Sequence, residues 1–192
     1  YKLVHYEKNR EQLQEIPHLP FLDLAVVFYC LLTDTPVGNA TVLIHNSHLE
    51  LWRRNTAWLY EAAKENTQRL LPECLVSMEE MLCELSGGQQ ATEGAGVPMY
   101  VLTNSRKSFG AACLLYEGVL GKCLERFGEN YYLLPSSVHE MILLPASAVG
   151  DSRELCALVR EMNQTQVRET EVLSDSVYYY SRENRRLEII DF

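Results

Sequence analysis

Basic residues are scarce in this sequence. Its 192 residues include 17 Lys and Arg against 26 Asp and Glu, which gives a formal net charge of −9. A protein that binds nucleic acid over an extended surface needs clusters of Lys and Arg that contact many phosphates. The basic residues form only three short runs, at 52–54, 105–107 and 182–186, and each is typical of a solvated turn. The composition therefore argues against nucleic-acid binding.

Long apolar runs are also absent. The longest, at 24–32, is too short to span a bilayer. No charged, apolar and small-residue leader opens the chain, so we expect a cytoplasmic protein that does not enter a membrane. The chain begins at Tyr1 rather than Met, from which we expect it to be the C-terminal part of a longer protein.

Paired cysteine motifs are missing as well. None of the six cysteines lies in a C-x-x-C arrangement, and most fall within apolar runs. Free cysteine behaves as a small apolar residue in a reducing compartment, so the pattern favours buried thiols over disulfides or zinc. The residues are Cys30, Cys74, Cys83, Cys113, Cys123 and Cys156.

The remaining composition is that of a folded globular protein. Hydrophobic residues make up 47% and charged residues 22% of the chain, which is long enough to bury a substantial core. Strand patterns joined by short turns alternate with single helices. This predicts one α+β domain over 1–192, with a mainly antiparallel sheet built from hairpins and about four helices packed against it. A Gly- and Gln-rich stretch near 86–98 predicts a flexible loop between two halves.

The first half is predicted to contain two strands and then helices. The β-branched and aromatic run 21–32 predicts one strand buried on both faces, and 40–44 predicts its hairpin partner in the centre of the sheet. A short helix is expected near 9–16. From Ser47 onward, apolar residues recur at helical spacing. Thr56 is the expected cap of a helix that runs to about Asn66.

The next segments are predicted from the same rules. Pro72 is expected to open a helix over 72–85. The strands 99–103 and 109–116 are expected to form a hairpin, followed by a helix over 117–127 that stops at Gly128. Asp151 is the expected cap of a further helix, and 177–181 with 186–190 predict a final hairpin.

The segment 133–145, LLPSSVHEMILLP, carries the first chemical candidates: Ser136, Ser137, His139 and Glu140. In an extended chain Ser137 and His139 share one face, and Ser136 and Glu140 share the other. The glycines of a G-x-S-x-G elbow are missing, and no oxyanion donors are evident. The segment is either a nucleophile beside its base or a turn whose hydroxyls bind backbone groups.

A metal site is the second candidate. His45 and His48 are three residues apart, and His139 or Glu140 would complete three zinc ligands. Ser47 as a helix cap explains the same segment without metal, and no H-E-x-x-H motif accompanies it. The glycines at 87–88 and 94–96 lack the lysine of a phosphate-binding loop, so no nucleotide or other cofactor is predicted.

Several motifs resemble those of a known family. They are N-x-H-L-x-x-W at 46–52, P-M-Y-V-L-T-N at 98–104 and L-P-S-S-x-H-E at 134–140. Together they are similar to an uncharacterised bacterial family, the domain of unknown function 5688, over nearly the whole chain. The resemblance implies a bacterial cytosolic domain and supplies no reaction.

Two functions follow from these patterns. The first is a non-catalytic protein-binding or regulatory module, whose sheet or tyrosine-bearing terminal hairpin contacts a protein partner or a second copy. The three tyrosines at 178–180 must alternate between faces, which favours core and surface roles together. The alternative is a hydrolase or metal-dependent enzyme that uses His139 with Ser137 or Glu140.

Overall fold

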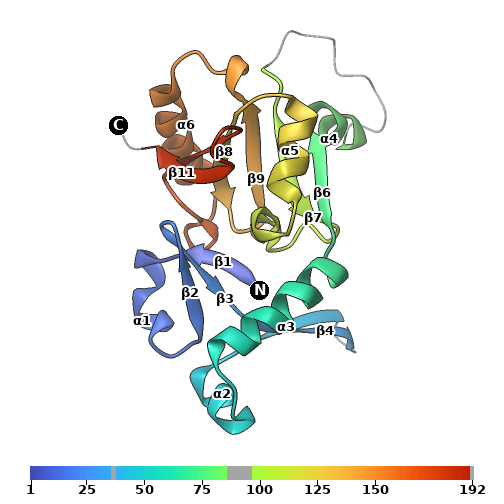
Figure 1. Cartoon of the computed structure of the whole chain (residues 1–192), viewed down its shortest axis with the longest axis vertical. Coiled ribbons are helices and arrows are strands. Elements are labelled where there is room, and N and C mark those ends of the chain that lie inside the picture. The colour runs from blue at the N-terminus through green and yellow to red at the C-terminus, as the bar shows by residue number, and fades with distance from the viewer. Residues whose placement is uncertain (36–37, 86–96, 191–192) are drawn as a thin grey trace. The chain divides into compact units, whose positions relative to one another are not determined.

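The computed structural model describes residues 1–35, 38–85 and 97–190 of the chain (Figure 1). Its strands form three antiparallel sheets of three, six and two strands, accompanied by helices. The predicted α+β class is therefore confirmed. No helix among the described residues is long and apolar enough to cross a membrane.

The chain divides into two compact units. Unit 1 comprises Tyr1–Leu71 and unit 2 comprises Pro72–Phe192. The division thus lies before the predicted loop near 86–98, of which residues 86–96 are outside the described part of the chain. That the two units make one domain stays a prediction.

Unit 1 contains a three-stranded sheet with β3 in its centre. The strands are β1 (Lys2–His5), β2 (His18–Phe21) and β3 (Leu24–Val27), in the order β1-β3-β2. Every residue of β3 is buried, as expected for a central strand. Between β1 and β2 lie a 3-10 helix (Glu7–Asn9) and α1 (Arg10–Leu13), which confirms the predicted short helix.

The predicted single strand over 21–32 is wrong. Leu22 has a φ of 54°, and this left-handed turn folds β2 back on β3. Tyr29–Thr35 then form β4, which pairs with β5 (Gly38–Leu43). The predicted hairpin is confirmed, but it forms a separate two-stranded sheet rather than the centre of a larger one. A continuous apolar run does not reveal where a tight turn interrupts it.

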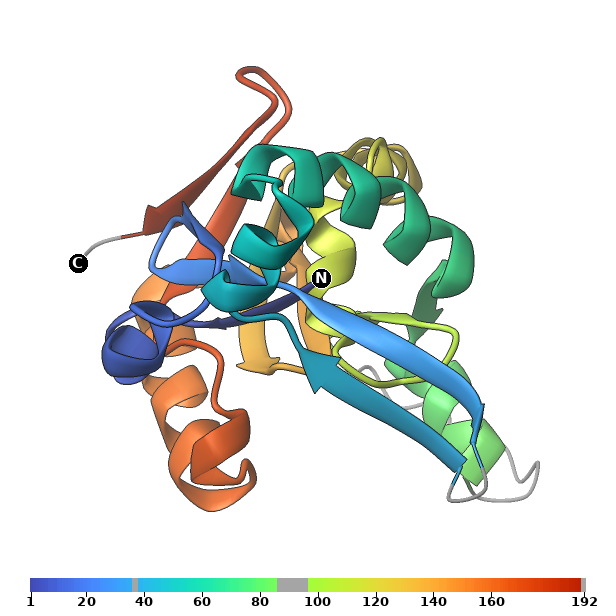
Figure 2. The same ribbon diagram turned by 90° about the horizontal axis from the view of Figure 1, so that it is seen from below.

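Figure 2 shows the β4–β5 hairpin as two long strands that extend away from the β1–β3–β2 sheet. After it come α2 (Asn46–Trp52) and α3 (Thr56–Leu70). The cap of α3 is Asn55, whose Oδ1 accepts a hydrogen bond of 2.9 Å from the backbone nitrogen of Trp58, so the predicted cap Thr56 was wrong by one residue. Asn and Thr both suit this position, which is why the pattern alone did not separate them.

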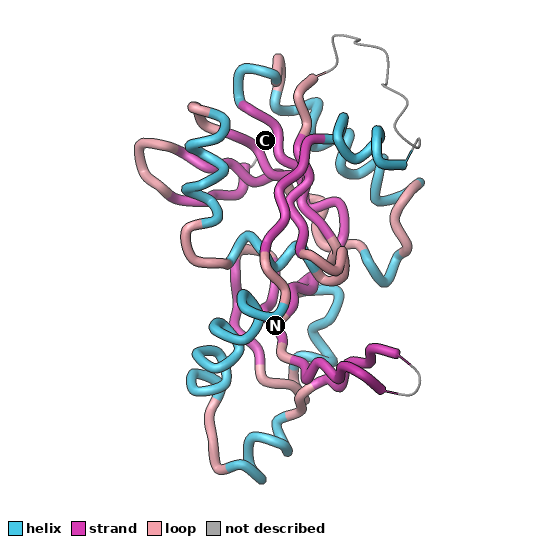
Figure 3. Tube along the Cα trace, turned by 90° about the vertical axis from the view of Figure 1, so that its right-hand side faces the viewer, coloured by secondary structure: helices cyan, strands magenta, loops and turns pink. Residues whose placement is uncertain are grey.

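Unit 2 is built on the six-stranded sheet, with strand order β11-β10-β8-β9-β7-β6. Helices cover both faces of this sheet (Figure 3). Along β8, Leu134 packs with Leu155 and Val159 of α6, while Tyr131 donates a hydrogen bond to the backbone oxygen of Leu120 in α5. The strands are β6 (Glu73–Ser77), β7 (Tyr100–Asn104), β8 (Tyr131–Ser137), β9 (Glu140–Pro145), β10 (Val177–Ser181) and β11 (Arg186–Ile190). The α-helices are α4 (Met78–Leu85), α5 (Val119–Phe127) and α6 (Ser152–Thr165), and the 3-10 helices span Gly110–Leu115, Ala146–Ala148 and Glu169–Glu171.

Three predicted elements of unit 2 are confirmed. Helix α5 ends at Gly128, which has a φ of 72° as a left-handed cap. Helix α6 begins after Asp151, whose side chain accepts a hydrogen bond from the backbone nitrogen of Arg153. The strands β10 and β11 form the predicted terminal hairpin.

Two other predictions are corrected. The first part of the predicted helix 72–85 is strand β6, which pairs with β7, and only Met78–Leu85 is helical. The predicted strand 109–116 is instead the 3-10 helix Gly110–Leu115. Both errors have one cause: β6 and β9 occupy the two edges of β7, so no edge remains for 109–116 to join as a hairpin partner.

The cysteines differ in burial. Cys113 and Cys123 are fully buried and Cys30 is exposed. None of the six, all of which the structure describes, is in a disulfide. Burial raises the pKa of both the Cys113 and the Cys123 thiols to about 12.

Gly110 provides a test of the packing under the 3-10 helix. A Cβ at this position would lie 2.2 Å from Thr103 Oγ1, 2.6 Å from the backbone oxygen of His139 and 2.7 Å from the backbone nitrogen of Asn104. Gly110→Ala should therefore lower the free energy of unfolding by about 1–3 kcal/mol in urea denaturation. Gly121→Ala is the control, because a Cβ there meets nothing within 4 Å. It should raise stability by about 0.5–1 kcal/mol, and equal effects of the two variants would contradict this account.

The buried thiols predict a loss of stability at alkaline pH. Unfolded cysteine loses its proton near pH 9, while folded Cys113 and Cys123 keep theirs to about pH 12. Their contribution to stability is complete below pH 9 and declines as the pH rises through this window. The urea midpoint should fall between about pH 8 and about pH 10. The fall should be smaller in Cys113→Ala, and an unchanged slope in that variant would refute the assignment.

Candidate functional site

The predicted serines lie where β8 turns into β9. Ser137 ends β8 and pairs with Glu140, the first residue of β9. The side chain of Ser136 is outside the described part of the structure. Ser137 is buried, and its Oγ accepts a hydrogen bond of 3.1 Å from the backbone nitrogen of His139. The hydroxyl thus binds the backbone of its own turn.

The imidazole of His139 has a different partner at each ring nitrogen. Its Nδ1 accepts a hydrogen bond of 3.1 Å from the backbone nitrogen of Phe109, and the two rings stack with centroids 5.6 Å apart. Because Nδ1 is the acceptor, the proton of the neutral ring is assigned to Nε2. Nε2 lies 3.7 Å from Glu171 Oε1, which is longer than a hydrogen bond.

The groups around His139 come from distant parts of the sequence. Thr103 Oγ1 donates to the backbone oxygen of His139 at 2.8 Å. The backbone nitrogen of Val138 donates to the backbone oxygen of Glu171 at 2.9 Å. Glu171 Oε1 is also 3.6 Å from Arg168 Nη1. These contacts tie the β8–β9 turn to β7 and to the segment before β10. Sequence reasoning missed Glu171, because spacing along the chain carries no signal for this contact.

His45 and His48 lie in unit 1, at the start of α2. The backbone nitrogen of His45 donates to His48 Nδ1 at 3.0 Å, so this ring caps the helix rather than Ser47. The His48 ring also stacks on Trp52, with centroids 5.8 Å apart. Among the described residues, no three His, Cys, Asp or Glu side chains are arranged to hold a metal ion.

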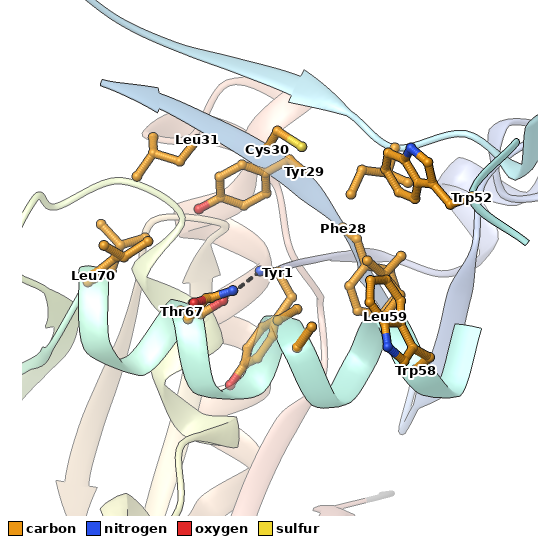
Figure 4. A pocket seen from close by; sticks show the side chains of 15 residues that line it. Tyr1, Phe28, Tyr29, Cys30, Leu31, Trp52, Trp58, Leu59, Thr67 and Leu70 are labelled. Carbon is orange, nitrogen blue, oxygen red and sulfur yellow. Dashed lines mark hydrogen bonds between the residues drawn. The ribbon is translucent and has the colours of Figure 1, made fainter. Parts of the chain in front are cut away.

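Unit 1 also contains a pocket that the sequence analysis did not predict. Its volume is about 570 Å³, and α3 and β4 form opposite sides of it (Figure 4). None of the lining residues has an acidic or basic side chain. The lining consists of Tyr1, Phe28, Tyr29, Cys30, Leu31, Ile44, Trp52, Trp58, Leu59, Ala62, Ala63, Asn66, Thr67, Leu70 and Leu71.

The helical side of the pocket follows from spacing along α3. The lining positions recur in pairs every four residues from Trp58 to Leu71, so they share one face of the helix. Two alanines in the middle of this face, Ala62 and Ala63, leave room that larger side chains would fill. Thr67 is buried on the same face, and its Oγ1 accepts a hydrogen bond of 2.8 Å from the backbone nitrogen of Tyr1.

Large apolar side chains at the pocket remain partly in water. Trp52 is 42% exposed, Trp58 is 45% exposed and Leu70 is 47% exposed. The guanidinium of Arg54 lies 5.1 Å from the centre of the Trp58 ring, and His48 stacks on Trp52. Each indole is thus supported by a neighbour while part of its surface stays open. The sequence showed these tryptophans as helix positions and could not show that they border a cavity.

The pocket has the features of a ligand-binding site. Its size and largely apolar lining with a few polar groups are typical of ligand-binding sites. Cys30 contributes a thiol to the lining, and none of the lining side chains is a histidine or a carboxylate.

Comparison with known proteins yields one match. A family model described as a family of unknown function (DUF5688) matches residues 1–182. No curated protein and no solved structure matches the chain. The comparisons therefore supply a family and no activity.

The hydrogen bond from Phe109 to His139 gives a test of the role of this ring. His139→Gln places no acceptor at the position of Nδ1 and removes this hydrogen bond from the partly buried amide of Phe109, which should cost about 0.5–1.5 kcal/mol of unfolding free energy. His139→Asn presents Oδ1 near that position and should recover about half or more of the loss. The measurement is urea denaturation of both variants. If Asn is no better than Gln, the ring is not held by this bond.

Proposed function

The chain belongs to this family of unknown function, and we propose that it is a non-catalytic module that binds an apolar segment of a protein partner in the pocket of unit 1. The observation that supports the proposal is a cavity of about 570 Å³ with no charged lining side chain, bordered by two tryptophans that are almost half exposed. Tryptophan is over-represented among residues that dominate binding energy at protein interfaces.

Charge favours a protein partner over nucleic acid. Unit 1 carries seven Lys and Arg against eight Asp and Glu, and none of them lines the pocket. Binding to phosphates releases counterions and weakens steeply with salt, whereas burial of apolar surface does not. Affinity for the proposed partner is accordingly insensitive to moderate salt. The exposed thiol of Cys30 suits a reducing compartment, which supports a cytoplasmic location.

The terminal hairpin is less suited to binding a partner. Tyr178 and Tyr180 are buried in unit 2, and the hydroxyl of Tyr179 accepts a hydrogen bond of 2.7 Å from Asn130 Nδ2. The tyrosines therefore contribute mainly to packing, and the pocket is the preferred contact surface.

The alternative function, a hydrolase or metal-dependent enzyme using His139 with Ser137 or Glu140, has less support. A general base must have a ring nitrogen within hydrogen-bond reach of the nucleophile. Here Nδ1 accepts from Phe109, Nε2 faces Glu171, and the Ser137 hydroxyl binds the turn backbone.

Site-specific cross-linking in cells that express the full protein tests the proposed pocket. A photoreactive benzoylphenylalanine at position 70, at the pocket, should form an adduct with a partner protein. The same residue at position 22 should not, because Leu22 is similarly exposed, at 40%, but lies in the β2–β3 turn outside the lining. Ala63→Trp, which fills the pocket with a bulky side chain, should abolish the adduct from position 70.

Three results would count against the proposal. Equal adducts from positions 70 and 22 would show general stickiness, and an adduct that survives Ala63→Trp would place the contact outside the pocket. An adduct of two copies of the chain would replace the partner with self-association. Circular dichroism of Ala63→Trp provides the control for folding.

A further inference from the structure

The pocket runs along the edge of strand β4. Three successive residues of this strand, Tyr29, Cys30 and Leu31, line it, together with Phe28, which directly precedes the strand. Successive side chains of a strand point to opposite faces of the sheet, so a pocket on one face would be lined by alternate residues only. Contact with every residue in turn means that the pocket lies beside the strand, where its backbone groups emerge.

The pairing of β4 with β5 determines which backbone groups emerge there. The backbone nitrogen of Ile44 donates to the backbone oxygen of Phe28 at 3.0 Å. Opposite residues of an antiparallel pair alternate between hydrogen-bonded and non-hydrogen-bonded positions. Phe28 and Ile44 therefore occupy a hydrogen-bonded position. Leu31, which pairs with Thr41, lies three residues further along the chain, so alternation puts it at a non-hydrogen-bonded position. Its N–H and C=O point away from β5.

The edge beyond Leu31 is open to an additional strand. The β4–β5 sheet has two strands in the described part of the chain. No described residue outside the hairpin forms a hydrogen bond with the backbone of Leu31. In Figure 4, Tyr29 and Leu31 lie on one side of the pocket and Leu59, Thr67 and Leu70 lie on the other, on α3.

The length of the pocket fits a short extended peptide. On α3 the lining extends from Trp58 to Leu70, twelve steps of the helix or about 18 Å. An extended chain covers this distance with about five residues. Peptides that add a strand to an exposed sheet edge obtain affinity from main-chain hydrogen bonds and specificity from pockets for alternate side chains.

The geometry points to strand addition: an extended, uncharged segment of the partner pairs with the edge of β4 at Leu31 and lies between β4 and α3. This inference rests on the proposed function and specifies how the partner is held. Alternate apolar side chains of the segment enter the pocket, and the others face water. Uncharged chemistry follows from lining side chains that include neither a cation to hold a carboxylate nor an anion to hold an amine. The same lack of a cationic side chain disfavours a fatty acid.

A peptide series tests the inference on the full protein. The probes are capped pentapeptides of the form X-Thr-X-Thr-X, with Leu, Ile, Val or Phe at X, and binding is measured by calorimetry. The tightest binder is then methylated at one backbone nitrogen at a time. Methylation at alternate positions should weaken binding about tenfold, because those amides face β4, while the intervening positions should change little.

Proline variants of the protein give the matching test. Leu31→Pro removes the N–H that faces the pocket, whereas Thr41→Pro removes the outward N–H of the residue directly opposite, on the other edge of the hairpin. Proline is tolerated at an edge where the N–H faces outward, so both variants retain the β4–β5 ladder. Leu31→Pro should weaken binding of the unmethylated peptide about tenfold, and Thr41→Pro should leave it unchanged.

The outcomes separate this inference from the proposed function. One outcome is that Ala63→Trp blocks peptide binding, but methylation changes the affinity equally at every position or at none. This would overturn strand addition and leave the pocket as a binding site. If none of the peptides binds, strand addition is overturned as well, while the cross-link from position 70 decides the proposed function independently. Binding of a fluorescent fatty acid to a protein that binds none of the peptides would also overturn strand addition.

Discussion

Backbone N–H and C=O groups that leave water need hydrogen-bond partners, and the main features of both units depend on this constraint. In unit 2, β6 and β9 satisfy both edges of β7, so the segment after β7 folds as a 3-10 helix with its own internal bonds. The amide of Phe109, at the start of that segment, is satisfied by the ring of His139. In unit 1, among the described residues, β4 has a partner strand, β5, on one side, and its other side borders the pocket.

The pocket exists because small side chains meet large ones. Ala62 and Ala63 leave space on the face of α3, and Trp52 and Trp58 border that space without filling it. Contact of apolar indole surface with water is unfavourable, so covering that surface with another apolar group lowers the free energy. The neighbours His48 and Arg54 hold the rings from one side, which reduces the conformational entropy that binding would otherwise cost. Unit 1 thus has a preformed apolar surface whose lining side chains carry no charge.

The segment LLPSSVHEMILLP shows how a motif changes its meaning in three dimensions. As a sequence it combines a hydroxyl, an imidazole and a carboxylate within five residues, the types found in hydrolases. In the fold, the Ser137 hydroxyl closes the turn, His139 accepts from Phe109, and Glu140 begins β9. The carboxylate that faces the imidazole is Glu171, which is 32 residues away in the sequence.

The sequence by itself determined the α+β class, the helices α5 and α6, the terminal hairpin and the family, because these depend on local periodicity, caps and motifs. Tertiary structure alone decided that 73–77 is a strand, that 110–115 is not, and that β4 and α3 enclose a pocket. Leu75 and Val76 suit a helix and a strand equally well, and only the edge of β7 selects between them. Likewise, Trp58 and Leu31 become neighbours of one cavity through contacts between elements, and no spacing along the chain encodes that contact.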